Sequence, residues 1–490
     1  MNIASRLEED RPVSPTTLSS PKTWSESLVK PTLSELKVQR PILLPLLLMN
    51  ITWFAKITIT TVFLGRLGEL SLSGATLGFT FANVTGFSVL TGLNFALEPI
   101  CGQAFGAKNF RLLHKTLVMA ASLLLIISLP IALLWINVDK ILLRFGQQED
   151  VSIMAKEYVV HLLPDLVITS FLSPLKIYLT AQNVTVPIMA ATALAIGLHV
   201  PLNVFLSKSM GVRGVSMAFW VTDLMILVML CIYVVIKENM KGGKWKEGGW
   251  WEQSGGDWIR MVKLAGPCCL TTCLEWWCYE IIVLLAGNLP DAKEALGVIA
   301  IVLNFDYLLC SVMLSLATCA SVRVANELGA NSAAAARASA YVSLGLAAVS
   351  GVLGGAAMAG ARGFWGALFT HEKGIIVGVK RTMLIVAVME VMNFSVLVSG
   401  GIARGTARPW LGTYASVCGF YLLALPLGVI LAFKVHLGLA GLLTGLAAGV
   451  AVCLLILLAF IARINWEEES RKAQILASRA IDEATNNDDQ

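Results

Sequence analysis

The sequence predicts an all-α polytopic membrane protein with twelve transmembrane helices. Of its 490 residues, 56% are hydrophobic and only 14% are charged, whereas a soluble domain carries about 25% charged residues. The apolar residues gather in runs long enough to cross a bilayer, which takes about 20 residues in a helix. These runs are continuous and do not alternate with polar residues, which excludes a transmembrane β-barrel.

Each apolar run is expected to be a helix, because an unpaired backbone amide or carbonyl is too costly in lipid. The predicted spans cover residues 40–65, 72–99, 112–138, 151–178, 184–207, 212–236, 260–287, 295–320, 333–359, 375–402, 410–433 and 437–463.

The polar segments divide the chain into five parts. These are an N-terminal tail (1–39), an N-lobe of six spans (40–236), a linker (237–259), a C-lobe of six spans (260–463) and a C-terminal tail (464–490). The first apolar run begins only near Pro41, so the N-terminal tail is not a signal peptide. Lysine and arginine are more frequent on the face that carries both tails, which predicts cytoplasmic termini.

The two halves of the chain resemble each other at a nearly constant offset of 222 to 227 residues. The matched landmarks are Gly65 and Gly287, Gly106 and Gly329, Pro187 and Pro409, and Gly211 and Gly438. Because each half has an even number of spans, both halves have the same orientation. Such parallel repeats are related by a pseudo-two-fold axis along the membrane normal.

Several classes of activity lack support in the sequence. It contains no G-x-x-x-x-G-K-[ST] nucleotide loop, no H-E-x-x-H and no G-x-S-x-G motif. The ten cysteines show no zinc-ligand spacing, and no basic stripe suggests nucleic acid. We therefore expect no enzyme, no metal and no cofactor, and a transport process driven by an ion gradient or by the cargo's own gradient.

Ionisable residues at membrane depth are costly and mark candidate functional sites. The N-terminal half contains Lys56, Asp165 and Asp223, and the C-terminal half contains Glu275, Glu280, Asp306 and Glu390. The repeat offset of 222 places Trp53 opposite Glu275. A proton-binding carboxylate is therefore expected in the C-lobe.

Span seven supplies the first candidate for proton coupling, Glu275. Tyr279 follows four residues later and shares its helix face, so it is a candidate to line the cavity and to donate a hydrogen bond to Glu275. Glu280 lies about 140° around an ideal helix from Glu275. The two acids are therefore expected to face different spaces.

Spans eight and ten supply further candidates. Glu390 and Asn393 are three residues apart and share a face; Glu390 is a proton-coupling candidate and Asn393 a cavity candidate. Asn304 and Asp306 point in roughly opposite directions, and Asp306 is favoured for the proton site, with Asn304 kept as a cavity candidate. The alternative for each of these acids is a hydrogen-bonded strut between helices.

Lys56 in span one leaves two interpretations open. It can form a buried ion pair with Asp165, or it can meet an anionic cargo in the substrate cavity. The position of Trp53, one turn before Lys56 and opposite Glu275 in the repeat, favours the cargo interpretation.

Four segments resemble one family of transporters. Residues 101–108 resemble its G-Q-A-x-G-A segment after helix two, and residues 323–330 resemble its R-V-x-N-E-L-G-A segment after helix eight. Residues 273–277 and 403–405 complete a similarity over roughly 35–470 to the plant branch of the multidrug and toxic compound extrusion (MATE or DETOXIFICATION) family. The segment 466–469 resembles a subgroup that includes abscisic-acid export and stomatal-signalling members.

The resemblance implies a V-shaped pair of six-helix lobes and export of organic solutes coupled to cations, with protons favoured over sodium. It also implies a protonation site on helices seven, eight and ten. Glu275 falls on the family's helix-seven glutamate. Glu390 is the nearest acid where plant relatives often have an aspartate. The helix-one aspartate of many prokaryotic relatives is absent, and its place is near Lys56.

We therefore expect a proton-coupled antiporter that exports a small organic solute, such as a hormone, secondary metabolite or xenobiotic, by alternating access. It is expected to act as a monomer in the lipid bilayer, with the plasma membrane favoured over the vacuolar membrane. Two alternatives remain. One is an anion channel or facilitator that uses Lys56 as its attractor. The other is a regulatory membrane protein that signals through its cytoplasmic loops, near Lys244, Trp245 and Trp250.

Overall fold

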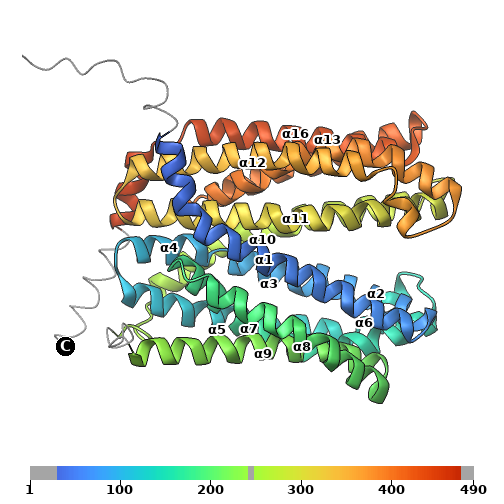
Figure 1. Cartoon of the computed structure of the whole chain (residues 1–490), viewed down its shortest axis with the longest axis horizontal. Coiled ribbons are helices and arrows are strands. Elements are labelled where there is room, and N and C mark those ends of the chain that lie inside the picture. The colour runs from blue at the N-terminus through green and yellow to red at the C-terminus, as the bar shows by residue number, and fades with distance from the viewer. Residues whose placement is uncertain (1–29, 241–247, 476–490) are drawn as a thin grey trace, which may run out of the picture.

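The computed structural model of the chain describes residues 30–240 and 248–475, which are almost entirely helical (Figure 1). Within these residues, twelve helices are long and apolar enough to cross a membrane. The prediction of an all-α protein with twelve spans is therefore confirmed.

The N-terminal half supplies the first six spans, of which the second is interrupted by a π-helical turn. Its elements are α1 (Lys30–Arg66), α2 (Glu69–Ala82), the π-helix η2 (Asn83–Phe87), α3 (Ser88–Asn94), α4 (Leu97–Gly106), α5 (Phe110–Ile136), the short α6 (Val138–Arg144), α7 (Glu149–Ala181), α8 (Val186–Met210) and α9 (Val212–Met240).

The C-terminal half supplies the other six spans, and two π-helical turns interrupt span eleven. Its elements are α10 (Gly255–Ala286), α11 (Ala292–Gly329), α12 (Ala333–Ala361), the 3-10 helix η4 (Gly366–Leu368), α13 (Lys373–Gly405), α14 (Trp410–Ser416), the π-helix η5 (Val417–Ala424), α15 (Leu425–Val429), the π-helix η6 (Ile430–Lys434) and α16 (Gly438–Ala462).

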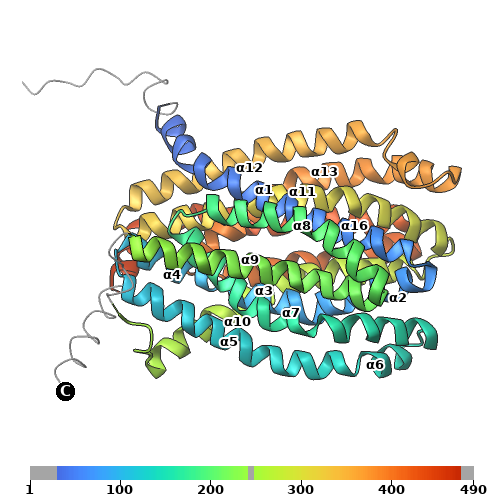
Figure 2. The ribbon, with the colours of Figure 1, turned by 60° about the horizontal axis from the view of Figure 1, so that its bottom comes forward.

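Each half of the chain has an apolar core of its own, and α10 of the C-terminal half also packs on the N-terminal half through Met261, Ala265 and Cys268. The largest core contains buried side chains from Cys278 to Ala473, and a second core contains only residues from Phe63 to Phe219. In Figure 1, α11, α12, α13 and α16 form the upper group of helices, and α5, α7, α8 and α9 form the lower group. Figure 2, turned by 60°, shows the same long helices running roughly parallel to one another.

The repeat seen in the sequence recurs in the backbone. Lys108 and Asn331, which follow spans two and eight, both adopt a left-handed conformation, with φ of 58° and 57°. Gly211 and Gly438, between the last two spans of each half, have φ of 61° and 56°. Asn331 and glycine tolerate this conformation more readily than other residues do. The chain therefore turns in the same way at equivalent points of the two lobes.

Helix α1 crosses from one lobe to the other. It begins beside α12 of the upper group and runs diagonally to α2 in the lower group (Figure 1). Near its start, Ile42 and Leu46 form a small apolar cluster with Cys319 of α11. The first span therefore joins the two lobes and does not belong to the N-lobe alone.

The helices extend beyond the predicted segment boundaries. Residues 30–39, predicted as part of the tail, form the start of α1, because Glu35 and Gln39 find polar partners in the C-lobe and become buried. The linker is shorter than 237–259, since α9 continues to Met240 and α10 begins at Gly255. In the C-terminal tail, residues 466–475 are helical, with Trp466 and Ala473 buried. Residues 1–29, Lys244 and Trp245 lie outside the described residues.

Candidate transport cavities

A cavity of about 110 Å³ lies within the C-lobe, between α10, α11, α13, α14 and α16. We call it the C-lobe cavity. Among its lining residues are Glu275, Tyr279, Asp306, Asn393 and Arg404. The structure thus brings four of the predicted site residues, from three different helices, to one space.

Helix α10 turns about half of its circumference toward the C-lobe cavity. Glu275 and Tyr279 both line it, as their shared helix face predicts. Glu280 also lines it, contrary to the expectation that the two acids face different spaces. The spacing of about 140° between them was a sound estimate, but the cavity wraps around the helix far enough to meet both.

Three polar side chains form a cluster at the back of this cavity. The carboxyl groups of Asp306 and Glu390 face each other within hydrogen-bonding range. The amide of Asn393 donates to Glu390 Oε2 and to the Tyr279 hydroxyl, both at 3.5 Å. Glu390 is 0% exposed and does not line the cavity itself, but it contacts Asp306 and Asn393, which do. The predicted pairing of Glu390 with Asn393 on one face is therefore present.

Asn304 does not belong to the site. It is exposed and does not line the C-lobe cavity, whereas Asp306 is buried and does. The two residues are about 200° apart on the helix, so only one of them can face inward. The structure corrects the assignment of Asn304 to the cavity.

A larger cavity of about 290 Å³ lies between the lobes, lined by α1, the interrupted span of α2 to α4, α7, α9, α10 and α11. We call it the central cavity. Its volume is close to that of ligand pockets, which begin at about 300 Å³. Four residues line both cavities and form their shared wall: Phe95, Thr272, Trp276 and Leu314. Glu275 thus lies within one helical turn of Thr272 and Trp276, which also face the central cavity.

Lys56 pairs with Asp223 of α9 and not with Asp165. Its ammonium donates to Asp223 Oδ2 at 2.7 Å and lies 3.5 Å from the centre of the Phe219 ring. Lys56 is 2% exposed and does not line the central cavity, although Asp223 and Phe219 do. The geometry replaces the predicted Asp165 pair with an Asp223 pair, and the cargo contact of Lys56 stays a prediction.

Sequence reasoning also missed a polar stripe on α7. Asp165, Thr169, Ser173, Lys176 and Thr180 all line the central cavity. Their spacings of 4, 8, 11 and 15 residues from Asp165 place them on one helix face. The same spacing can be read from the sequence of span four, although a lysine near a predicted helix end can also reach the interface and is therefore less informative.

The two motifs that follow spans two and eight pack against each other at the end of the molecule where α4 lies. We call this the inner end. A Cβ atom on Gly106 would lie 2.1 Å from the carbonyl oxygen of Asn326, and one on Gly329 would lie 2.1 Å from that of Gln103. The Gln103 side chain donates to the Gly405 carbonyl at 3.3 Å, and that of Asn326 donates to the Ala181 carbonyl at 3.1 Å.

These inner contacts are reciprocal under the repeat. The offset is 223 for both Gln103 to Asn326 and Gly106 to Gly329, and the accepting carbonyls, those of Ala181 and Gly405, are 224 apart. Such a self-complementary contact is typical of a two-fold axis. Glycine is required because the backbones approach within contact distance. The sequence motifs are therefore the closing surfaces of the inner end.

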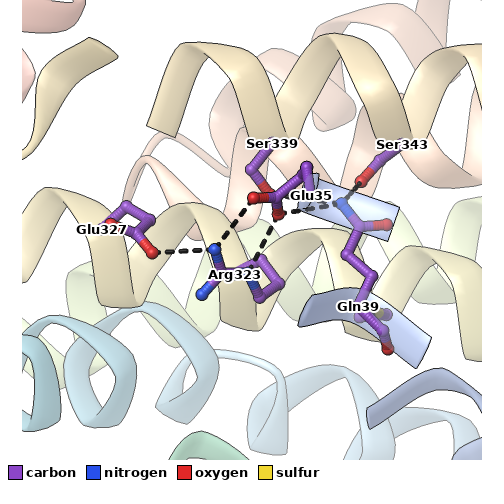
Figure 3. A network of polar contacts seen from close by, with 7 residues as sticks. Glu35, Gln39, Arg323, Glu327, Ser339 and Ser343 are labelled. Atoms are coloured by element: carbon purple, nitrogen blue, oxygen red, sulfur yellow. Dashed lines mark hydrogen bonds and ion pairs between the residues drawn. The ribbon is translucent and has the colours of Figure 1, made fainter. Parts of the chain in front are cut away.

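Ion pairs reinforce this closure. Arg323 of α11 binds both carboxylate oxygens of Glu35 at 3.0 and 3.1 Å, and also pairs with Glu327 at 2.8 Å (Figure 3). Gln39, one turn after Glu35, donates to Ser343 of α12 at 3.1 Å (Figure 3). The start of α1 is thus bound to the C-lobe by charge-assisted and neutral hydrogen bonds.

One further ion pair joins the lobes beside the shared wall. Arg404 of α13 donates to Glu98 of α4 at 2.9 Å, and its guanidinium lies 4.4 Å from the centre of the Phe95 ring. Glu98 is only 1% exposed. Breaking this pair would leave a buried charge without a partner, so it favours the arrangement of lobes described here.

Comparison with known proteins decides the family. The sequence profile named MatE matches residues 45–205 and 267–430, which fall in the two lobes. The chain belongs to the MatE family. The repeat offset of the two lobes agrees with the two matched segments, which begin 222 residues apart (267 minus 45). MatE proteins are transporters, so this chain is a multi-pass membrane transporter and not an enzyme.

The relatives of this MatE protein include plant proteins over nearly its full length. Protein DETOXIFICATION 56 of Arabidopsis thaliana is 58% identical over 462 residues, which cover 94% of each chain. Protein DETOXIFICATION 49 of the same plant is 38% identical, over 97% of this chain and 92% of that protein. A crystal structure of the eukaryotic MATE transporter AtDTX14 superposes with a TM-score of 0.85 at 29% identity, covering 91% of this chain and all of that one.

Proposed function

We propose that this MatE protein is a proton-coupled antiporter that exports a small organic solute from the cytosol by alternating access. The observation that carries the proposal is that two cavities of different size share one wall. The C-lobe cavity holds Glu275 and Asp306 in about 110 Å³, which is too small for an organic solute. The central cavity, about 290 Å³, is large enough for one.

The C-lobe cluster has the chemistry of a proton site. Asp306 and Glu390 face each other in a site that removes them from water. Two adjacent carboxylates cannot both be charged without a large electrostatic cost, so such a pair holds a proton in common. Within the described residues, neither Asp306 Oδ1 nor Glu390 Oε1 has a hydrogen-bond partner. A shared proton would turn one of these carboxyls into a donor.

Glu275 is placed to link the proton to the cargo. It lines the C-lobe cavity, and its neighbour Trp276 lines both cavities. Proton gain or loss by Glu275 itself changes the charge on α10, and a ligand in the central cavity contacts the same helix. Each ligand therefore biases the conformation that the other binds, which is the requirement for exchange.

The same proposal assigns the orientation. The inner end, closed by the two motifs and by the Arg404–Glu98 pair, faces the cytosol, together with both termini. The structure then corresponds to the conformation closed toward the cytosol. We propose the plasma membrane as the site of action and a monomer as the working unit, because each chain contains both lobes and both cavities.

Flux in proteoliposomes tests the function. Purified protein is reconstituted, and a panel of labelled hormones, alkaloids and organic anions is offered under an imposed pH gradient. We expect solute movement against the proton flow, abolished by a protonophore and by Glu275→Gln. The matched control is Glu294→Gln, a change of the same chemistry at the outer end of α11, where we expect normal flux.

The competing functions give different results. An anion channel would conduct anions without proton exchange, and Glu275→Gln would not change its flux. A regulatory membrane protein would show no solute flux at all. Either result would contradict the proposed antiport.

A further inference from the structure

The central cavity contains a lysine, Lys176, that forms no ion pair with any residue that the structure describes. Lys176 of α7 is partly buried and lines this cavity. Within the described part of the chain, no carboxylate oxygen lies within 4.0 Å of its ammonium. A lysine that served as a strut between helices would instead be paired, since an isolated charge at membrane depth is costly.

The acidic neighbours of Lys176 are occupied elsewhere. Asp223 accepts the ammonium of Lys56 at 2.7 Å, so these two charges cancel. The carboxyl of Asp165 faces that of Asp223. Two facing carboxyls hold a proton in common, so together with Lys56 this group carries no net charge. The Lys176 side chain leans toward the N-terminal end of its helix, as all helical side chains do, and so points along the polar stripe.

The rest of the central cavity combines aromatic, aliphatic and polar side chains. Its aromatic residues are Trp53, Phe79, Phe87, Phe95, Phe219 and Trp276. Ten uncharged polar residues also line it. One of them, Asn94, is 6% exposed and has a side-chain oxygen without a hydrogen-bond partner among the described residues. Lys176 is the only basic residue among the described residues that line this cavity, and aromatic side chains offer apolar surface beside it. This combination suits a ligand with an apolar body and one negative group.

This lysine is not a consequence of the repeat. The offset of 224 that relates Ala181 to Gly405 relates Lys176 to position 400, which is Gly400 (176 plus 224). Gly400 lines the C-lobe cavity. The repeat therefore places no cation at the equivalent position of the C-lobe cavity, just as Glu275 of that cavity is matched by Trp53.

We propose that Lys176 binds the anionic group of the cargo and that the cargo is an amphipathic organic anion, whose apolar body lies against the aromatic walls of the central cavity. This inference rests on the proposed function, because it names the class of solute exported. Charge-assisted hydrogen bonds from the ammonium fix the anionic end. The aromatic side chains accept different bodies of similar size.

Equilibrium binding to the full chain in lipid nanodiscs tests the inference, with three probes that share a naphthalene body. They are 1-naphthoate, neutral 1-naphthamide and cationic 1-naphthylmethylammonium. The wild type is expected to prefer 1-naphthoate. Lys176→Gln is expected to weaken 1-naphthoate binding by about tenfold, the usual worth of a hydrogen bond to a charged group, and to leave 1-naphthamide nearly unchanged.

Two further variants separate charge from folding. Lys176→Arg keeps the charge and is expected to keep the preference for the anion. Lys208→Gln removes an exposed lysine at the end of α8 and is expected to bind all three probes as the wild type does. The proposal is overturned if the wild type does not prefer 1-naphthoate to 1-naphthamide. It is equally overturned if Lys176→Gln retains that preference, or weakens all three probes alike.

The assay uses no proton gradient, so its outcome is distinct from that of the flux experiment. Lys176-dependent binding of 1-naphthoate without proton-driven flux would contradict the antiport and leave the anion site standing. Proton-driven flux, combined with equal binding of the three probes, would support the antiport and contradict the anion site.

Discussion

The ion pair between Lys56 and Asp223 lies in a polar network that joins α1, α8 and α9. Thr60, one turn after Lys56, has its hydroxyl 3.2 Å from His199 Nε2, and His199 Nδ1 lies 2.7 Å from the Thr222 hydroxyl. All of these side chains except Asp223 are buried. Removing one charge would leave the other without a partner in a largely dry environment, which costs more than the pair contributes.

We predict that Lys56→Met lowers the free energy of unfolding by about 3 to 5 kcal/mol. The double variant with Asp223→Leu is expected to recover most of this loss, because no buried charge remains. Thermal unfolding of the detergent-solubilised protein measures both. If Asp165→Leu restored stability and Asp223→Leu did not, the assignment of the ion pair would be wrong.

Helical spacing in the sequence identified side-chain pairs on one helix, and the structure contains them. Tyr279 lies beside Glu275 and Asn393 beside Glu390 because positions three or four apart share a face. The partner of Lys56 was missed for a physical reason. Which of two aspartates meets a lysine on another helix depends on how helices pack, and no spacing within one helix contains that information.

At the scale of elements, α1 is held at its start by a clasp of Arg323, Glu35 and Glu327 (Figure 3). The guanidinium serves two carboxylates at once, with a bidentate geometry that lysine cannot reproduce. The polar composition of residues 30–39 suggested a tail. These residues are nevertheless helical, because the partners of their polar groups lie about 290 residues later in the chain.

We predict that Arg323→Gln reduces stability by about 3 kcal/mol, since two carboxylates lose their counter-charge. Arg323→Lys is expected to recover only part of this loss. Arg337→Gln, which changes an exposed arginine on α12, serves as the control. Equal melting temperatures for Arg323→Gln and the control would show that the clasp does not stabilise the protein.

A second prediction concerns the glycines that let the two motifs of the inner end pack together. Gly329→Ala places a methyl group 2.1 Å from a backbone oxygen, a distance that real contacts do not show, so the two motifs must separate. The inner end should then open to water. Gly345→Ala, where no atom lies within 4 Å of the added carbon, is the control.

Labelling with a membrane-impermeant thiol reagent measures this opening. Cys101 of α4 and Cys319 of α11 are buried in the structure. We expect Gly329→Ala to raise their labelling from the inner side severalfold, and Gly345→Ala to leave it unchanged. Protection equal to that of the wild type would mean that these glycines are not needed for closure.

At the scale of the whole molecule, composition and the repeat were sufficient to predict twelve spans and two similar lobes. The nearly constant offset between the halves reveals the two lobes because each lobe closes on the other with equivalent turns and small residues, as at Gly106 and Gly329. The interruption of span two by η2 was not predictable, since π-helical turns leave no clear periodic pattern. The arrangement of the cavities also depends on such local features, because Asn83 and Phe87 of η2 line the central cavity.

In the proposed antiport, the carboxyl groups of the C-lobe cavity bind a proton that cargo binding displaces. Calorimetric titration with a transported solute measures this exchange directly, in buffers of different ionisation enthalpy. The heat of binding to the wild type should vary with the buffer, because protons are released. Glu275→Gln should bind the solute with a heat that does not depend on the buffer. The claim would be contradicted if the wild type released no proton, or if Glu275→Gln released as many protons as the wild type.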